Sequence, residues 1–175
     1  MDIRRYFVVV AARDAVEAAV GGGYIEVNHG KAGPLERMRA GDGVVFYSPR
    51  NGEGASTLQA FTAIAWVVGA QLKQPDVAED ATRPFRRSAR FVAAQPTSIR
   101  PLIDTLDFIR NKQHWGTALR NGFVQISRAD FDRIGRALGR CDGLRADAAG
   151  SGTASDAAAV ASGEPAQRGD GSPIA

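Results

Sequence analysis

Residues 28–50, NHGKAGPLERMRAGDGVVFYSPR, contain the stretch that decides how this chain folds. Pro34 is expected to open a short helical turn that runs to Met38, because proline is favoured in the first turn of a helix. Residues 40–42 are expected to form a turn, and VVFYS at 44–48 is rich in the residues that favour strands. The segment therefore predicts a turn and a short helix that lead into a β-strand.

Further elements are expected on both sides of this segment. They are a buried strand at 5–12, a short helix capped by Asp14 and closed by Gly21–Gly23, a half-buried strand at 24–28, a loop at 50–56, one long bent strand at 58–72 with Gly69 near its far end, a strand at 85–93, a partly helical segment at 99–106, a short helix at 111–119 and a short strand at 123–126. Ser127 with Asp130 resembles a capping box, and the helix that follows carries Phe131, Ile134 and Leu138 at helical spacing.

The order of these elements predicts the fold class. The strands do not alternate with helices of 10 to 15 residues, so a doubly wound parallel sheet is not expected. We predict an α+β fold: a mostly antiparallel, partly closed β-barrel with short peripheral helices.

Composition divides the chain into two parts. Residues 1–140 contain 20 Lys and Arg against 14 Asp and Glu, a net charge of +6. Residues 141–175 are built of small and polar residues and carry a net charge of −3, so we predict a folded domain at 1–140 and a disordered tail at 141–175. A basic domain suits a polyanionic partner, although a solvated surface explains the charge as well.

Other compositional features limit the class of protein. No apolar run reaches the roughly 18 residues that span a bilayer, so no membrane partner is expected. Cys141 is the single cysteine, which excludes an internal disulfide and a zinc site built from cysteines. These features together predict a cytoplasmic protein.

The motifs of common enzymes are absent from the sequence. Gly30-Lys31 lacks the first glycine and the Ser/Thr of a phosphate-binding loop, and Ser48 lies in FYSPR rather than in G-x-S-x-G. His29 and His114 are far apart and have no acidic partner at metal spacing. We therefore expect no catalytic residue, no metal and no cofactor, and a protein that is not an enzyme.

Aromatic residues beside basic ones form the positive signal. Tyr47 precedes Arg50, Phe85 precedes Arg86 and Arg87, and Trp115 lies between Lys112 and Arg120. Flat bases stack on aromatic and guanidinium planes while Arg and Lys hold the phosphates. The same aromatic residues could instead belong to the core. We favour the core for Phe91 and leave both readings open for Tyr47 and Trp115.

Seven sequence blocks in fixed order resemble the EVE-domain family, a branch of the PUA-like superfamily. The blocks are Tyr6–Ala11 (YFVVVA), His29–Asp42 (HGKAGPLERMRAGD), Phe46–Pro49 (FYSP), Leu58–Ala65 (LQAFTAIA), Pro84–Arg87 (PFRR), Trp115–Gly116 and Asp130–Ile134 (DFDRI). The sequence departs from the family pattern at Gly43, where a bulky residue is expected, at Ala65, where glycine is usual, and at Phe46, which replaces a tyrosine. These departures are expected to loosen the packing beside the strand.

The resemblance implies a PUA-like barrel with a cleft near one end. Relatives of this fold bind RNA, and EVE domains are similar to modules that capture modified bases in DNA by extruding them. We therefore predict a non-catalytic module that binds DNA or RNA, with a modified base as its finer specificity. A protein that binds a nucleotide or an anionic metabolite in the same cleft is the alternative. The residues expected to contact the ligand are His29, Lys31, Tyr47, Ser48, Arg86, Arg87 and Trp115.

Overall fold

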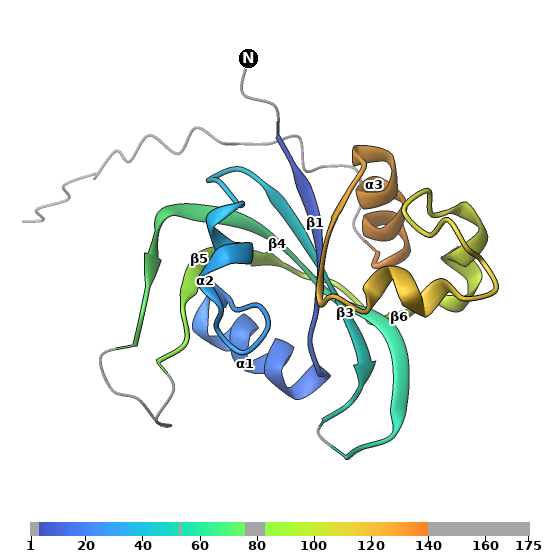
Figure 1. Ribbon diagram of the computed structural model, residues 1–175, viewed down its shortest axis with the longest axis horizontal. Helices are drawn as coiled ribbons and strands as arrows, with labels where there is room; N and C mark the ends of the chain where they lie inside the picture. The colour runs from blue at the N-terminus through green and yellow to red at the C-terminus, as the bar shows by residue number, and fades with distance from the viewer. Residues whose placement is uncertain (1–3, 53, 76–82, 140–175) are drawn as a thin grey trace, which may run out of the picture.

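Seven strands and five short helical segments form in the part of the chain that the computed structural model describes, which is residues 4–52, 54–75 and 83–139 (Figure 1). In chain order they are β1 Tyr6–Val10, α1 Arg13–Gly22, β2 Tyr24–Ile25, α2 Ala32–Glu36, β3 Gly43–Arg50, β4 Thr57–Lys73, β5 Arg86–Val92, β6 Thr97–Ser98, the 3-10 helices η1 Arg100–Thr105 and η2 Trp115–Leu119, β7 Phe123–Ile126 and α3 Arg128–Ala137. The tail predicted at 141–175 lies outside the described residues.

The strands pair in one sheet in the order β2-β5-β4-β3-β1-β7, and β6 pairs with β4 off this path. All pairs are antiparallel except β1 with β3, which is parallel. The α+β class and the mostly antiparallel sheet are therefore confirmed. The partly closed barrel is not, because the path of strand pairing between described residues ends at β2 and β7 without joining them.

The long strand predicted at 58–72 is confirmed as β4, which pairs with β3, β5 and β6. Its pairing with β5 shifts register between Val67 and Leu72, the stretch that includes Gly69. The strand predicted at 24–28 is shorter, because only Tyr24–Ile25 pair and residues 28–30 turn away from the sheet with positive φ. Asp14 was expected to cap a helix that begins at Ala15, but α1 begins two residues earlier, at Arg13, and its N-cap is Ala12.

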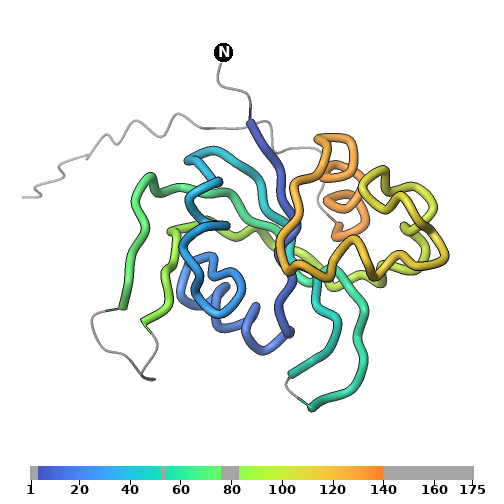
Figure 2. The backbone as a smooth tube through the Cα atoms, viewed as in Figure 1, coloured from blue at the N-terminus to red at the C-terminus, as the bar shows by residue number. Residues whose placement is uncertain are grey.

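Two hydrophobic cores lie on opposite faces of the sheet. One face packs against α1 and α2, which fill it with side chains such as Val16 and Leu35. The other packs against α3 and η1 through residues such as Phe131 and Ile103. Figure 2 shows the same division, with the chain between β1 and β3 on one side and the segment after β6 on the other.

The turn before β3 is fixed by a buried carboxylate. Asp42 is 3% exposed and accepts hydrogen bonds from the backbone N–H groups of Arg5 (2.9 Å) and Arg39 (2.8 Å). The guanidinium of Arg5 reaches the same carboxylate at 3.1 Å. These contacts hold the start of β1 beside the start of β3. The short helix predicted from Pro34 to Met38 forms as α2, but it begins two residues earlier and ends at Glu36, and the predicted turn follows before β3.

Gly43 does not leave loose packing, contrary to the expectation from the sequence. A Cβ atom placed on it would lie 2.7 Å from Cζ of Phe131 and 2.9 Å from Cδ1 of Tyr6. These two rings, whose centroids are 4.7 Å apart, fill the space that a larger residue at position 43 would need. The space beside Gly43 is therefore filled by Phe131, from the first turn of α3, and by Tyr6.

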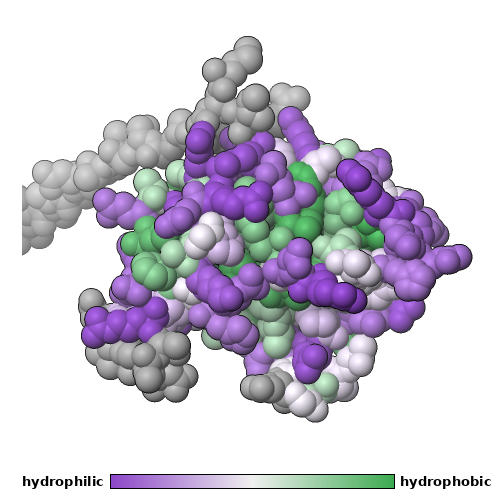
Figure 3. All heavy atoms as spheres, viewed as in Figure 1, coloured by the Kyte–Doolittle hydropathy of each residue, from purple (hydrophilic) through white to green (hydrophobic). Residues whose placement is uncertain are grey.

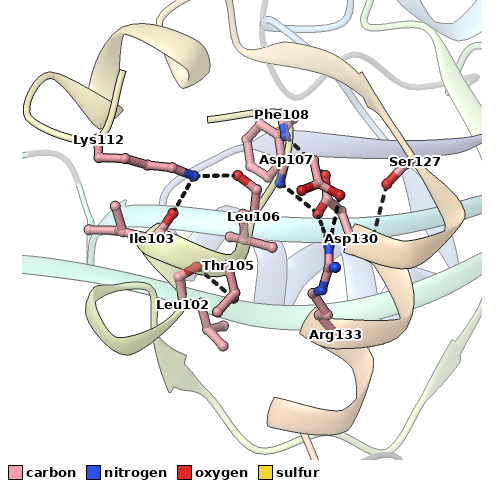
Figure 4. A network of polar contacts seen from close by, with 10 residues as sticks. All are labelled: Leu102, Ile103, Thr105, Leu106, Asp107, Phe108, Lys112, Ser127, Asp130 and Arg133. Atoms are coloured by element: carbon pink, nitrogen blue, oxygen red, sulfur yellow. Dashed lines mark hydrogen bonds and ion pairs between the residues drawn. The ribbon is translucent and has the colours of Figure 1, made fainter. Parts of the chain in front are cut away.

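Asp130 was expected to close a capping box, and only half of that box forms (Figure 4). Oγ of Ser127 accepts a hydrogen bond from the Asp130 backbone N–H at 3.0 Å. The Asp130 carboxylate, fully buried, accepts instead from the backbone N–H groups of Asp107 and Phe108 at 2.9 and 3.0 Å. Asp130 thus ties the loop after η1 to α3, and the carboxylate is also paired with Arg133.

Two further properties concern the helices and the surface. No helix among the described residues is long and apolar enough to cross a bilayer. On the face seen in Figure 3, hydrophilic side chains cover most of the surface, and apolar side chains show between them.

The packing around Gly43 gives a first prediction. Gly43→Ala should lower the free energy of unfolding by about 1–3 kcal/mol, because the new methyl group would press on the rings of Phe131 and Tyr6. Urea denaturation checks this. Gly33→Ala is the control, because no atom lies within 4 Å of the point where its methyl group would be, and it should be neutral or slightly stabilising. Equal effects of the two changes would contradict the packing account.

Candidate nucleotide-binding hollow

A hollow of about 680 Å³ opens between α1, the ends of β1 and β3, and the segment after α1. We call it the α1 hollow. Its apolar lining includes Phe46 and Pro49, and its polar lining residues are Asp14, Tyr24, Glu26, Asn28, His29, Arg50 and Arg86. A volume of this size is ordinary for a small-molecule or nucleotide site.

One wall of the α1 hollow is a turn with an uncommon backbone. Asn28 and His29 have φ values of 50° and 57°, and Gly30 follows at 80°. Left-handed backbone costs free energy in residues other than glycine, and such residues gather at ligand sites. The Asn28 side chain donates to the Asn121 carbonyl at 3.2 Å, which ties the turn to the loop before β7. The turn therefore holds the His29 ring at the hollow.

A second wall is a stack of flat groups. The guanidinium carbon of Arg86 lies 4.0 Å from the centre of the Tyr24 ring. Nε of Arg86 donates to the Glu26 carboxylate at 3.1 Å, so the cation is held from two directions. All three residues are partly buried. The stack presents a fixed cation and an aromatic group to whatever enters the hollow.

The rim is formed where β3 runs beyond β1. The parallel pairing of β1 and β3 ends at Val10 and Tyr47, so Pro49 and Arg50 extend past it. The β3–β4 ladder is irregular between Ser48 and Arg50, and bulges of this kind often redirect side chains beside a site. Arg50 is exposed at this rim.

The structure brings only part of the predicted site together. His29 and Arg86 both line the α1 hollow. Lys31 is exposed in the same turn, one residue after Gly30, but it does not line the hollow. The remaining four predicted residues lie in the core or on the other face of the sheet.

Tyr47 was predicted to stack on a ligand, and its burial does not fit that role. It is 4% exposed and packs edge-on against Phe61 and Trp115 in the core beneath α3 and η1. Burial raises the pKa of Tyr47 to about 12, although nearby Arg100 opposes this shift. The strand turns Phe46, not Tyr47, toward the α1 hollow, because successive side chains point to opposite faces.

Arg87 and Ser48 are also structural in this fold. Arg87, 5% exposed, donates to the carbonyl oxygens of Leu35, Gly69 and Ala70 at 2.8–3.1 Å. Burial lowers the pKa of Arg87, although Asp42 opposes this shift. Ser48 is fully buried, and its hydroxyl pairs with that of Thr62 at 2.8 Å. Neither side chain faces the hollow.

Trp115 is partly exposed and lies on the other side of the β3–β4 hairpin from the α1 hollow, packed against the core that contains Tyr47.

Sequence reasoning missed the hollow's other polar groups, Asp14, Tyr24, Glu26, Asn28 and Arg50. Adjacent Asn28 and His29, followed by Gly30, were the available signal, because asparagine and glycine tolerate the left-handed backbone that such a turn needs.

A metal site has no candidate in this region. Among residues 4–52, 54–75 and 83–139, no three His, Cys, Asp or Glu side chains lie close enough together to hold an ion. Asp14 and Glu26 both line the hollow, but Glu26 is already paired with Arg86. The groups present are suited to hydrogen bonding, stacking and charge pairing.

The fold is a small α+β domain with one curved sheet between two helical layers (Figure 1). The sequence profile of the EVE domain matches residues 5–137, and the chain belongs to the EVE-domain family. It is 40% identical over 136 residues to the UPF0310 protein msl3206 of Mesorhizobium japonicum, covering 77% of this chain and 91% of that protein. A UPF0310 protein of Mycolicibacterium gilvum is 42% identical over 128 residues, 73% and 90% of the two chains.

Solved structures share the fold at low sequence identity. Rpa0253 from Rhodopseudomonas palustris has a TM-score of 0.52 at 12% identity, and the match covers 82% of this chain and 99% of that one. The YTH domain of the Zygosaccharomyces rouxii MRB1 protein, solved in complex with N6-methyladenosine RNA, has a TM-score of 0.51 at 15% identity, with 79% and 88% covered. The α+β architecture predicted from the sequence is thus shared with these PUA-like neighbours.

The raised pKa of Tyr47 gives a prediction about alkaline stability. The unfolded chain ionises this phenol near its ordinary pKa of 10, but the folded protein does so only near 12. Relative to Tyr47→Phe, the wild-type protein should therefore lose stability as pH rises from 10 to 12, on the order of 2 kcal/mol. Urea denaturation of both proteins at pH 8 and pH 11.5 checks this. A difference in stability that is the same at both pH values would contradict the burial of the hydroxyl.

Proposed function

We propose that this protein is a non-catalytic nucleic-acid-binding module that holds one extruded nucleotide in the α1 hollow. The observation that carries the proposal is the hollow itself: an open depression with the stacked Tyr24–Arg86 pair on one side and the Asn28–His29 turn on another. A nucleobase has flat faces that stack and edges that form hydrogen bonds, so it matches both walls.

The charges near the hollow support a phosphate-bearing ligand. Arg50 is exposed at the rim, and Lys31 is exposed on the turn that forms one wall. Arg86 carries a partner carboxylate, so its contribution is a flat, fixed surface more than a free charge. Residues 1–140 as a whole carry a net charge of +6, which favours a polyanion over a neutral ligand.

The fold relationship supports a finer version, in which the extruded base carries a modification. The Zygosaccharomyces rouxii YTH domain, which shares this fold, was solved with N6-methyladenosine RNA. A hollow can distinguish a methylated base from a plain one by the extra contacts that the methyl group makes with apolar side chains of its lining. Val10 and Ala11, both partly exposed, supply such apolar surface in the α1 hollow.

A binding panel tests the proposal. Short DNA and RNA oligonucleotides, each with and without a single methylated base, are titrated with the protein by fluorescence anisotropy at two salt concentrations. Binding that weakens steeply with salt supports a nucleic-acid ligand. If only free nucleotides or anionic metabolites bind, the small-molecule alternative is correct. If no modified oligonucleotide binds more tightly than its plain counterpart at fixed salt, the modified-base version is wrong.

Arg86 provides a specific prediction within this panel. Arg86→Gln can keep a hydrogen bond to Glu26 but removes the flat cation over Tyr24, and oligonucleotide affinity should fall about tenfold, or about 1.4 kcal/mol. Arg90→Gln is the matched control: it removes the same charge from an exposed residue of β5 that does not line the hollow. Equal losses in the two variants would show that only net charge matters.

A further inference from the structure

Three residues form a second cluster on the other side of the β3–β4 hairpin from the α1 hollow. We call Gln59, Arg100 and Trp115 the Trp115 cluster. Nε and Nη2 of Arg100 both donate to the Gln59 side-chain oxygen, at 3.0 and 2.7 Å. The Arg100 guanidinium lies 5.7 Å from the centre of the Trp115 ring.

Arg100 is exposed and is fixed by a neutral partner, a combination that sets it apart from buried Arg87, which donates to backbone carbonyl oxygens, and from the arginines that pair with carboxylates. Five arginines of the described residues form ion pairs with carboxylates: Arg5, Arg13, Arg86, Arg128 and Arg133. Arg100 forms no such pair within the described part of the chain, and the acceptor that fixes it is a neutral amide. Its guanidinium is therefore oriented but not neutralised, and Nη1 is left for a further acceptor. An oriented, uncompensated arginine is suited to a phosphate.

The backbone at Gln59 is strained in a way that serves this arrangement. Gln59 lies inside β4 with φ at 52°, and its carbonyl accepts from the Ile99 N–H at 3.0 Å. In the described residues the only other non-glycine positions with positive φ are Asn28 and His29, in the wall of the α1 hollow. Such strain persists where surrounding contacts hold it, and it concentrates at ligand sites.

Trp115 is supported by the core on one side, is partly exposed, and has the Arg100 guanidinium over its ring. Its ring meets the Tyr47 ring edge-on, with centroids 6.3 Å apart and an interplanar angle of 84°. Tyr47 is almost fully buried, but Trp115 is only partly so, and Arg100 beside it is exposed. The buried tyrosine therefore supports the indole at the surface, next to the cation.

The cluster lies close to the α1 hollow although the two occupy different sides of the hairpin. Ser48 pairs with Ala60 and Arg50 with Thr57, so Gln59 is on the strand next to Pro49, a residue of the hollow. Neighbouring strands are about 5 Å apart. Figure 2 shows the β3–β4 hairpin projecting beyond the rest of the sheet. A ligand that contacts both places has to pass around this hairpin.

We propose that the Trp115 cluster is a second contact for the same strand of nucleic acid whose base enters the α1 hollow. Arg100 binds a backbone phosphate of a flanking nucleotide, and Trp115 stacks on its base. The inference rests on the proposed function and deepens it. The ligand becomes a single-stranded or locally opened polynucleotide, since a free nucleotide cannot reach both places.

A substitution that adds one negative charge to the cluster tests this proposal. Gln59→Glu keeps the acceptor for Arg100 but neutralises the cation. Affinity for an eight-nucleotide single strand should fall about tenfold, and the slope of log affinity against log salt should become shallower by about 0.7, the loss of one phosphate contact. Binding of the mononucleotide should not change. Gln125→Glu, at an exposed residue of β7, is the control for net charge.

The same substitution separates a ligand contact from a structural one. If Arg100 only holds Gln59 in place, an ion pair there should preserve or raise thermal stability and leave oligonucleotide affinity at the value of Gln125→Glu. That result overturns the inference. Trp115→Leu is a second test. It should lower the affinity for the eight-nucleotide strand about tenfold and leave the affinity for the mononucleotide unchanged. An unchanged affinity for the strand counts against the cluster.

Failure of the inference and failure of the proposed function give different results. If the wild-type protein binds no oligonucleotide, or Arg86→Gln binds as well as Arg90→Gln, the function assigned to the hollow is wrong. If Arg86→Gln weakens the oligonucleotide while Gln59→Glu matches its control, the hollow stands and the Trp115 cluster is not part of the site.

Discussion

The parallel pairing of β1 with β3 is the constraint on which the rest of the structure depends. Parallel neighbours cannot be joined by a tight turn, so the chain must cross one face of the sheet before it returns. That crossover contains α1, β2 and α2, and it places the Asn28–His29 turn over the ends of β1 and β3. The α1 hollow is the space left between the crossover and those two strand ends.

Buried polar groups then fix the positions of the segments around the crossover. Asp42 binds two backbone N–H groups and one guanidinium at the start of β3, and Arg87 binds three carbonyl oxygens between α2 and β4. A buried charge is tolerated only when its partners are satisfied, so each group forces the segments around it into one arrangement. Arg87 was predicted to contact a ligand because it follows Phe85 and Arg86 in the sequence. The same sequence pattern is found whether the arginine contacts a base or, as here, three backbone carbonyl oxygens.

Much of the fold could be predicted from local pattern. The long β4, the short β7 and the amphipathic α3 were found because hydrophobic period and β-branched residues act within a few positions of one another. The family resemblance could be recognised from the sequence because each of its blocks is a short continuous stretch, and the match to the EVE-domain profile confirmed it. The candidate site was found only in part, since His29 and Arg86 lie 57 positions apart and meet only through the crossover.

The sequence by itself determined most of the elements, the α+β class, the family and the basic character of the domain, because each depends on residue type and short-range spacing. The tertiary structure alone decided which side of β3 faces the α1 hollow and which faces the core beneath α3 and η1. Phe46 reaches the hollow and Tyr47 the core because α3 and η1 cover one face, while the crossover covers the other incompletely. It also decided that Phe131 occupies the space beside Gly43 and that Arg100 meets a neutral partner rather than a carboxylate. These facts depend on contacts between segments far apart in the chain, which no local pattern records.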